Sequence, residues 1–425
     1  MFDRLIFMNM YAKDEFVLGS DNKKSTYNNV IVLIGSFIIW FFFPILSIPI
    51  FLFLLGYNQI TLTKTNQFLL IILIACSFGL ISYVTGSGGV EDNDMVRYRQ
   101  VFGLMTDRQV EELNAGSYFF LIINWFIANY ISPDGQVMSF AFTAISYFFI
   151  ILSIKRFSTL YVDKKYHCLV LFSIIFIISI LVTTEFVKQV LSSALFLFGL
   201  TYKIRATKIA YIWLVLSVLI HPASAIMIAP LFFYDSQVVR RNIYFILAIC
   251  IILSQIDIVQ ILANFSNLPI MEALGFSDRL QAYSSDYEGF GGSKRYYLIF
   301  LFYIVQILPI YYTFFKTKDT KNPICVFFLL TVCILLFNMS NTHNFARLTR
   351  NFYPFQILAL IFSIQYINFP FKKLWIYFIM ICLFGSNMIE FTRTMVNVNY
   401  HATFMGNDWL ALFFSNVVNF IDYKV

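Results

Sequence analysis

Runs of roughly 20 apolar residues recur along this chain, separated by short polar stretches. Two of the clearest cover residues 68–85 and 137–155. A run of this length with few charges matches an α-helix that crosses the hydrocarbon core of a bilayer. The composition agrees, because 59% of the residues are hydrophobic and 12% are charged, whereas about a quarter are charged in soluble proteins. We therefore expect an all-α, polytopic integral membrane protein.

The apolar runs predict about ten to thirteen membrane helices, some of them broken or re-entrant. The clear candidates are residues 28–56, 68–85, 137–155, 166–183, 186–202, 243–262, 296–315, 324–339, 350–367 and 373–389. Two further runs do not fit a simple span: 117–131 is short, and 209–234 is interrupted by His221-Pro222. Because proline interrupts a helix, we expect half-helices at 209–220 and 223–234 that enter and leave on one side. His221 would then lie deep in the protein.

No repeat or linker divides the sequence, so residues 1–425 are predicted to be one transmembrane domain. It would carry a polar N-terminal tail at 1–27 and a C-terminal tail at 390–425. The two long polar loops, 86–116 and 263–295, are expected on the periplasmic side.

Lysine and arginine in short loops predict the orientation of membrane helices. Such residues cluster at 155–165, 203–208, 316–321 and 372–373, which we expect in the cytoplasm. Counting charges does not decide on which side of the membrane residues 86–116 lie. Single crossings by 28–56 and 117–131 would place that loop in the cytoplasm. A hairpin around Pro44, or a re-entrant 117–131, would place it outside.

Several classes of site are excluded by what the chain lacks. The net charge of +7 is spread over short loops and reports topology, so no nucleic-acid partner is expected. All six cysteines lie in apolar runs without C-x-x-C spacing, which predicts neither a metal site nor a disulfide. There is no P-loop, no G-x-G-x-x-G and no cytoplasmic Asp-x-Asp for a nucleotide.

The densest polar segment is residues 86–116, with six acidic residues and three arginines between apolar runs. Within it, Asp94, Tyr98 and Phe102 have the spacing of one helix face, and Arg97 lies on the same side. The simpler interpretation is a solvated loop whose acids and bases pair. The alternative is that this loop contributes to a reactive site.

Four further polar groupings interrupt apolar sequence. They are Glu185, Lys188 and Gln189 at the start of a predicted helix, His221 at the helix break, Arg279 and Tyr283 in the loop 263–295, and Arg347 and Arg350 at a helix end. Simpler roles exist, since Glu185 and Lys188 can pair with each other and His221 can be a hydrogen-bonded core residue. Ionisable groups at membrane depth nevertheless mark functional cavities by default.

The charge rule allows all five groupings to lie on the outer face. Arginine offers planar, bidentate donors to phosphate oxygens, so this set of side chains suits a phosphorylated substrate. A phosphorylated donor that carries no nucleotide and is used outside the cytoplasm is most naturally a lipid-linked sugar.

At these residues the chain resembles the Wzy-type O-antigen polymerases and the related EpsG-like exopolysaccharide polymerases. That family carries G-x-D-Y-x-x-Y-x-x-x-F after its second apolar segment. Asp94, Tyr98 and Phe102 occupy the Asp, second Tyr and Phe positions, and Met95 replaces the first Tyr.

The remaining family motifs follow in order over roughly residues 68–367. A helix that opens with Arg-Gln corresponds to Lys188-Gln189, a departure that weakens any bidentate role. F-H-x-S-A is matched by residues 220–225, the basic-Tyr loop by Arg279–Tyr283, and the final arginine before an aromatic pair by Arg347.

The resemblance implies a glycosyltransferase-C-like enzyme of the bacterial inner membrane, with its active site on the periplasmic side. Its substrates would be oligosaccharide units on undecaprenyl diphosphate, and its partners would be membrane lipid and a chain-length regulator protein. It would need no cofactor and no metal. The sugar hydroxyl needs a base, for which Asp94 or His221 are the candidates and Glu185 the outsider.

The leaving lipid diphosphate needs cationic stabilisation rather than a general acid. The expected substrate-binding residues are Arg97, Tyr98, Lys188, Gln189, Arg279, Tyr283, Arg347 and Arg350. Two rival functions stay open: a flippase for the same lipid-linked sugars, which should show internal repeats, and an O-antigen ligase, which has similar needs for arginine and histidine.

Overall fold

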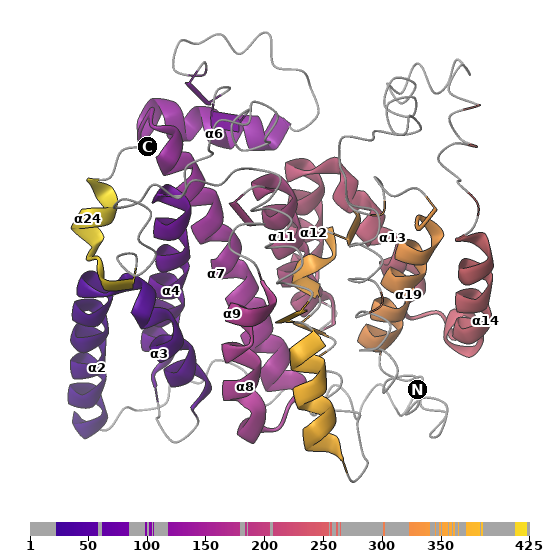
Figure 1. Ribbon diagram of the computed structural model, residues 1–425, viewed down its shortest axis with the longest axis horizontal. Helices are drawn as coiled ribbons and strands as arrows, with labels where there is room; N and C mark the ends of the chain where they lie inside the picture. The colour runs from indigo at the N-terminus through magenta and orange to yellow at the C-terminus, as the bar shows by residue number, and fades with distance from the viewer. Residues whose placement is uncertain are drawn as a thin grey trace.

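The structure is a computed structural model of the whole chain. It describes residues 23–57, 62–84, 98–99, 102–103, 105, 118–178, 183–184, 186–204, 207–254, 256, 261, 264, 301, 323–340, 345, 348–349, 351–355, 357–358, 360–361, 364, 371–382, 384–385 and 413–422. All regular secondary structure among these residues is helical, and most helices stand side by side as a bundle (Figure 1). The predicted all-α membrane fold is therefore confirmed.

The bundle is built on α4 (Lys64–Val84) and α7 (Gly135–Tyr161), which pack antiparallel along their whole length. At one end the Thr143 hydroxyl donates to Ser82 Oγ over 3.0 Å, and at the other Lys155 donates to the Gln67 amide oxygen. Both helices are long and apolar enough to cross a membrane. Small polar side chains let the two backbones approach closely, as is common between membrane helices.

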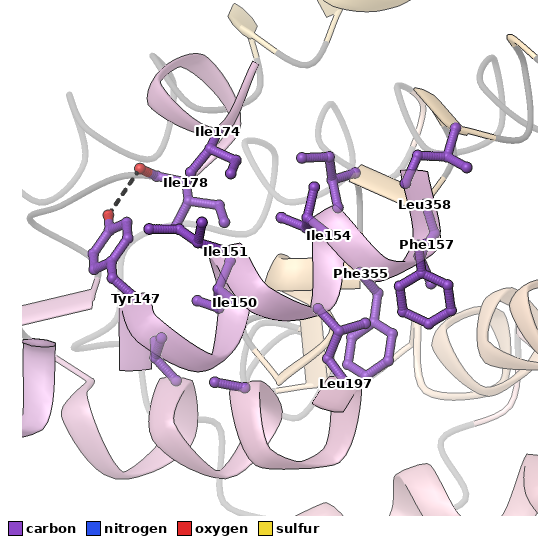
Figure 2. Close-up of a cluster of buried hydrophobic side chains, with 14 of the residues drawn as sticks. Tyr147, Ile150, Ile151, Ile154, Phe157, Ile174, Ile178, Leu197, Phe355 and Leu358 are labelled. Carbon is purple, nitrogen blue, oxygen red and sulfur yellow. Dashed lines mark hydrogen bonds between the residues drawn. The ribbon is translucent and has the colours of Figure 1, made fainter. Parts of the chain in front are cut away.

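A third central helix, α11 (Val187–Lys203), runs parallel to α7. The guanidinium of Arg156 on α7 donates to Tyr202 Oη at 3.0 Å, near the C-terminal end of α11. Between α7 and its neighbours lies the main apolar core (Figure 2). There the Tyr147 hydroxyl donates to the Ile178 carbonyl oxygen at 3.2 Å, which satisfies a fully buried phenol.

The predicted single span 28–56 is instead two helices, α2 (Lys23–Phe42) and α3 (Pro44–Gly56). Phe43 between them has non-helical angles (φ −140°, ψ 65°), and α2 and α3 lie side by side (Figure 1). The chain thus folds back before Pro44, which takes the first position of α3, where its missing N–H leaves no helix hydrogen bond unmade. This is the hairpin that the sequence left as an alternative.

The predicted span 166–183 is also interrupted. It begins with a 3-10 turn, η4 (Lys164–Tyr166), and continues as α8 (His167–Phe172) and α9 (Ile174–Ile177). The Ser173 hydroxyl at the junction donates to the Val170 carbonyl at 2.6 Å, the local competition with helix bonds that bends helices.

The interruption at His221-Pro222 is as predicted. Helix α12 (Ile209–Ile220) ends there, a 3-10 turn η5 (Pro222–Ser224) follows, and α13 (Ala225–Phe233) continues the chain. Tyr234, just after α13, lies within electrostatic range of Lys203 and Tyr211, just before and at the start of α12. The chain therefore returns to the end from which it entered.

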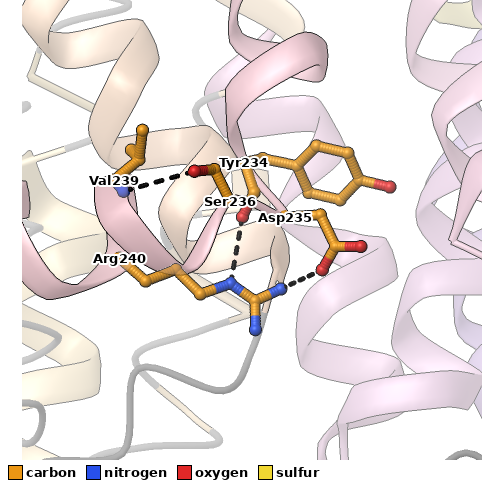
Figure 3. Close-up of polar contacts among 5 residues, drawn as sticks. All are labelled: Tyr234, Asp235, Ser236, Val239 and Arg240. Carbon is orange, nitrogen blue, oxygen red and sulfur yellow. Dashed lines mark hydrogen bonds and ion pairs between the residues drawn. The ribbon is translucent and has the colours of Figure 1, made fainter.

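The turn from α13 into α14 (Gln237–Leu253) is closed by polar contacts (Figure 3). Arg240 donates from Nε to the Tyr234 carbonyl at 3.2 Å and forms an ion pair with Asp235. The Ser236 side chain caps α14. Because α13 and α14 meet at 120°, α14 leads away again and packs against α19 (Pro323–Phe337).

The two ends of the bundle differ in character. At the "basic end", formed by residues 161–166, 203–204, 207–208 and 234–240, Lys165 and Lys372 both lie over the Tyr166 ring. At the "α6 end", α6 (Tyr118–Tyr130) lies crosswise to α7 (Figure 1), so this part of the predicted run 117–131 does not cross the bundle. A short C-terminal helix, α24 (Val417–Ile421), packs there against α4.

Few of the described helices are individually long enough to span a bilayer. Only α4 and α7 qualify, with a third span if the bent pair α13 and α14 counts as one. The other apolar helices in the described ranges, such as α3 and α12, are shorter. The predicted count of about ten to thirteen spans stays a prediction, since nearly all of residues 296–315 and several of 350–367 lie outside the described part.

Candidate functional site

A second, smaller apolar cluster at the α6 end holds the described part of the loop 86–116. Phe102 and Met105 are completely buried in it, and Tyr98 packs at its edge. The cluster also contains Phe120 of α6 and residues of α7, α11 and α12. These three loop residues are therefore part of the packed protein rather than of a solvated loop.

Lys188 lies above this cluster, in the first turn of α11. Its ammonium nitrogen is 4.3 Å from the centre of the Tyr98 ring and 5.2 Å from that of Phe120. The two rings are themselves in edge contact, with centroids 5.5 Å apart. Both distances fall within the roughly 6 Å over which a cation is attracted to an aromatic face. Tyr98 and Lys188, 90 positions apart, thus form one unit.

His221 lies at the same level as Lys188 on the neighbouring helix. The hydroxyl of Ser192 on α11 donates to the Ser217 carbonyl of α12 at 2.8 Å, which fixes the register of this antiparallel pair. Lys188 is one turn from Ser192 and His221 one turn from Ser217, in the same direction, about 6 Å further along each axis. His221 is half-buried and follows Ile220, a member of the same apolar cluster.

The backbone at the break is satisfied by hydroxyl groups. The Ser217 carbonyl accepts from Ser192 and, at 3.0 Å, from the Ser224 hydroxyl. Ser224 also contacts the His221 carbonyl, to which its backbone N–H donates at 2.9 Å. Non-helical backbone at membrane depth needs such partners. They fix the backbone of His221 at the break between α12 and η5.

An adjacent face of α11 contacts Asn351, which directly follows the predicted site residue Arg350. The Ser193 hydroxyl donates to the Asn351 carbonyl at 2.6 Å, so the residue after Arg350 touches α11 one turn from Gln189. Gln189 Oε1 and Asn351 Oδ1 are buried without a hydrogen-bond partner. Unpaired amide oxygens in a protein interior cost about 1–3 kcal/mol each. Such groups recur at sites that bind polar ligands.

Four of the eleven predicted site residues can be placed. Tyr98, Lys188, Gln189 and His221 all lie at the α6 end, around the first turns of α11. The others fall outside the described residues: Asp94, Arg97, Glu185, Arg279, Tyr283, Arg347 and Arg350. Among the described residues no three possible metal ligands gather together.

Two residues at this end were missed by sequence reasoning. Arg99, next to Tyr98, donates from Nε to Ser139 Oγ of α7 at 3.2 Å. Asn351 is almost fully buried against α11. Charge alone gave no reason to prefer Arg99 over Arg97 or Arg108, and the neutral Asn351 stood beside more conspicuous arginines.

Comparison with known proteins gives one match. The model of the EpsG family matches residues 71–400, which is most of the chain and includes every residue placed above. No curated protein and no solved structure shows significant similarity to the chain.

Proposed function

The chain belongs to the EpsG family, and from this premise we propose that it is an O-antigen polymerase. It would join oligosaccharide units carried on undecaprenyl diphosphate, at the periplasmic face of a bacterial inner membrane. The coarser part of this statement, a membrane protein of a polysaccharide polymerase family, follows from the family match and the apolar helices.

The observation that carries the proposal is the position of Lys188. Its ammonium group lies over Tyr98 and Phe120 at the N-terminus of α11, within one layer of His221. A cation at a helix N-terminus adds to the partial positive charge there, and together they favour an anion such as a diphosphate. The aromatic rings under the lysine attract its charge and hold it at this position.

The proposed chemistry needs two kinds of group. As the glycosidic bond to the lipid carrier breaks, negative charge develops on the diphosphate, and Lys188 would stabilise it with Arg97, Arg279, Arg347 and Arg350. The attacking hydroxyl would give its proton to Asp94 or His221, with Glu185 as the less favoured base. A well-placed base contributes roughly 10²–10⁴ in rate.

The arrangement of the two ends supports the proposed face. The site lies at the α6 end, whereas Lys165, Lys203 and Lys372 lie at the other. By the positive-inside rule the basic end belongs to the cytoplasm, which leaves the α6 end for the periplasm. The sequence left two alternatives under which residues 86–116 would lie outside the cytoplasm: a hairpin at Pro44 and a segment 117–131 that does not cross. The hairpin and the crosswise α6 favour these alternatives.

The test is a set of single variants in a strain lacking the chromosomal gene, read as ladders of surface polysaccharide. Lys188→Met and His221→Ala should abolish the ladder, and Lys188→Arg should retain it because arginine also binds phosphate. Lys203→Met is the matched control. Its ammonium lies 4.6 Å from the Tyr211 ring at the basic end, and its loss should leave the ladder intact.

The polysaccharide left in the inactive variants separates this function from its rivals. A polymerase mutant should still attach single units to the lipid A core, whereas a flippase or ligase mutant should attach none. A full-length ladder from both Lys188→Met and His221→Ala, at normal protein level, would disprove the proposed site.

A further inference from the structure

The side chain of Arg99 packs along the start of α7, in the space left open because Gly135 has no side chain. We call this space the seat. A Cβ atom placed on Gly135 would be 3.0 Å from Arg99 Cγ and 3.2 Å from Arg99 Cβ. Such distances are closer than ordinary packing, so any other residue at position 135 would press on the arginine stem. Beyond the stem, Arg99 Nε donates to Ser139 Oγ, and the Ser139 hydroxyl donates to the Gly135 carbonyl at 3.2 Å.

The seat itself is rigidly held. Asp134 caps α7 by accepting from the Gln136 backbone N–H at 2.8 Å. The Gln136 side-chain amide donates to the Tyr83 carbonyl of α4, also at 2.8 Å. The start of α7 is thus fixed to the end of α4, and a contact with it fixes the contacting residue relative to the whole bundle.

Arg99 adjoins Tyr98, whose ring lies under Lys188. Its other neighbours in the loop, Phe102 and Met105, are buried in the small apolar cluster. Apolar burial is not directional, so hydrogen bonds fix the position of this segment. Asn129 Nδ2 of α6 donates to the Met105 carbonyl at 3.3 Å, and Arg99, next to Tyr98, donates to Ser139. The seat therefore sets where the Tyr98 ring can lie.

We propose that Arg99 is a positioning residue, which anchors the described segment around Tyr98 on Gly135 and Ser139 and so holds the Tyr98 ring beneath Lys188. This inference rests on the proposed function, in which Lys188 binds the substrate diphosphate. Arg99 itself need not touch the substrate.

Docking can be measured without any enzyme assay. In a chain with its six native cysteines replaced by serine, Met105→Cys places one thiol on the buried side of the docked segment. Reaction with a maleimide in membrane vesicles then reports opening of the loop. Arg99→Ala and Gly135→Ala should each raise the labelling rate at least about tenfold. Gly103→Ala is the matched control, since nothing lies within 4 Å of a Cβ there, and its labelling should stay at the starting rate.

Two further variants distinguish docking from general damage. Arg99→Lys keeps the Cβ and Cγ atoms and a terminal donor, so it should restore most of the protection and most of the polymer lost in Arg99→Ala. Gly135→Ala should raise labelling less in the Arg99→Ala background than in the natural chain, because most of the arginine side chain that the new methyl group would press on is already gone.

The outcomes separate the two proposals. Unchanged labelling in both Arg99→Ala and Gly135→Ala would overturn the docking role, whatever happens to polymer. Raised labelling with undiminished polymer would show that the position of the Tyr98 ring does not matter to the reaction, which would overturn Tyr98 as a site residue and leave Lys188 and His221 to the test of their own variants. Raised labelling with reduced polymer, both reversed by Arg99→Lys, is the expected result.

Discussion

The contact between Lys188 and Tyr98 makes a quantitative prediction. The ammonium lies 4.3 Å from the ring centre, and Lys188 is half-buried. Cation–π energies run from about 0.5–1 kcal/mol at exposed sites to about 2 kcal/mol when the cation is desolvated. We therefore expect a coupling free energy of about 1 kcal/mol between the two side chains.

A double-mutant cycle isolates this energy. The four proteins are the natural chain, Tyr98→Leu, Lys188→Met and the combination, each unfolded by detergent titration in mixed micelles and followed by circular dichroism. Tyr98→Leu alone also loses the edge contact with Phe120, worth about 0.5–1.5 kcal/mol. That loss occurs whether Lys188 is present or replaced by methionine. It therefore cancels in the difference between the two, and only the interaction between Tyr98 and Lys188 remains.

The matched cycle uses Lys203 and Tyr211 at the basic end, where the ammonium lies 4.6 Å from the ring centre and donates to the phenol oxygen. Because Tyr211 is exposed, we expect a coupling no larger than about 1 kcal/mol there and no change in polymer. Distant sites add within about 0.3–0.5 kcal/mol. A coupling for Lys188 and Tyr98 inside that margin would refute the account of how the lysine is held.

Two further predictions concern packing and titration. A Cβ on Gly56 would lie 2.5 Å from Cys168 Cα, a backbone atom that cannot turn aside, so Gly56→Ala should cost about 1–3 kcal/mol of stability. Gly35→Ala, with nothing within 4 Å, is its control, and equal thermal midpoints in detergent would contradict the close contact. Burial and the nearby Lys165 ammonium lower the pKa of Lys372 from its ordinary 10.5, and Asp163 offsets part of this. The unfolded chain then binds more protons between the folded pKa and 10.5, so stability rises with pH across that window. The thermal midpoint of the natural chain should therefore be higher at pH 10 than at pH 8, by a small amount because solvent screens the charge. Lys372→Met should lack this difference. The same pH dependence in both proteins would contradict the prediction.

The parts of the fold predicted from the sequence are those that one local feature determines. The break at His221-Pro222 follows from a proline in an apolar run, and both half-helices have their predicted bounds within about two residues. Pro44 was ambiguous because a proline suits both a kinked single span and the first turn of a new helix. What decides for the hairpin is tertiary, including the bond from Trp40 on α2 to Ser77 on α4.

The site was predictable as a set of residue types but not as a set of contacts. Spacing put Tyr98 and Phe102 on one helix face, and both do contact the same apolar cluster. No local pattern links Tyr98 to Lys188 or Arg99 to Gly135, since these pairs depend on how α7 and α11 pack. For Asp94, Glu185 and the late arginines the assignments stay predictions.

The re-entrant pair α12 and α13 also constrains the order in which the chain is assembled. Its turning point exposes carbonyl groups that hydrocarbon cannot accommodate, and Ser192 of α11 supplies a donor for one of them. We therefore expect the pair to be more stable at membrane depth once α11 has joined it than as an independent unit during synthesis.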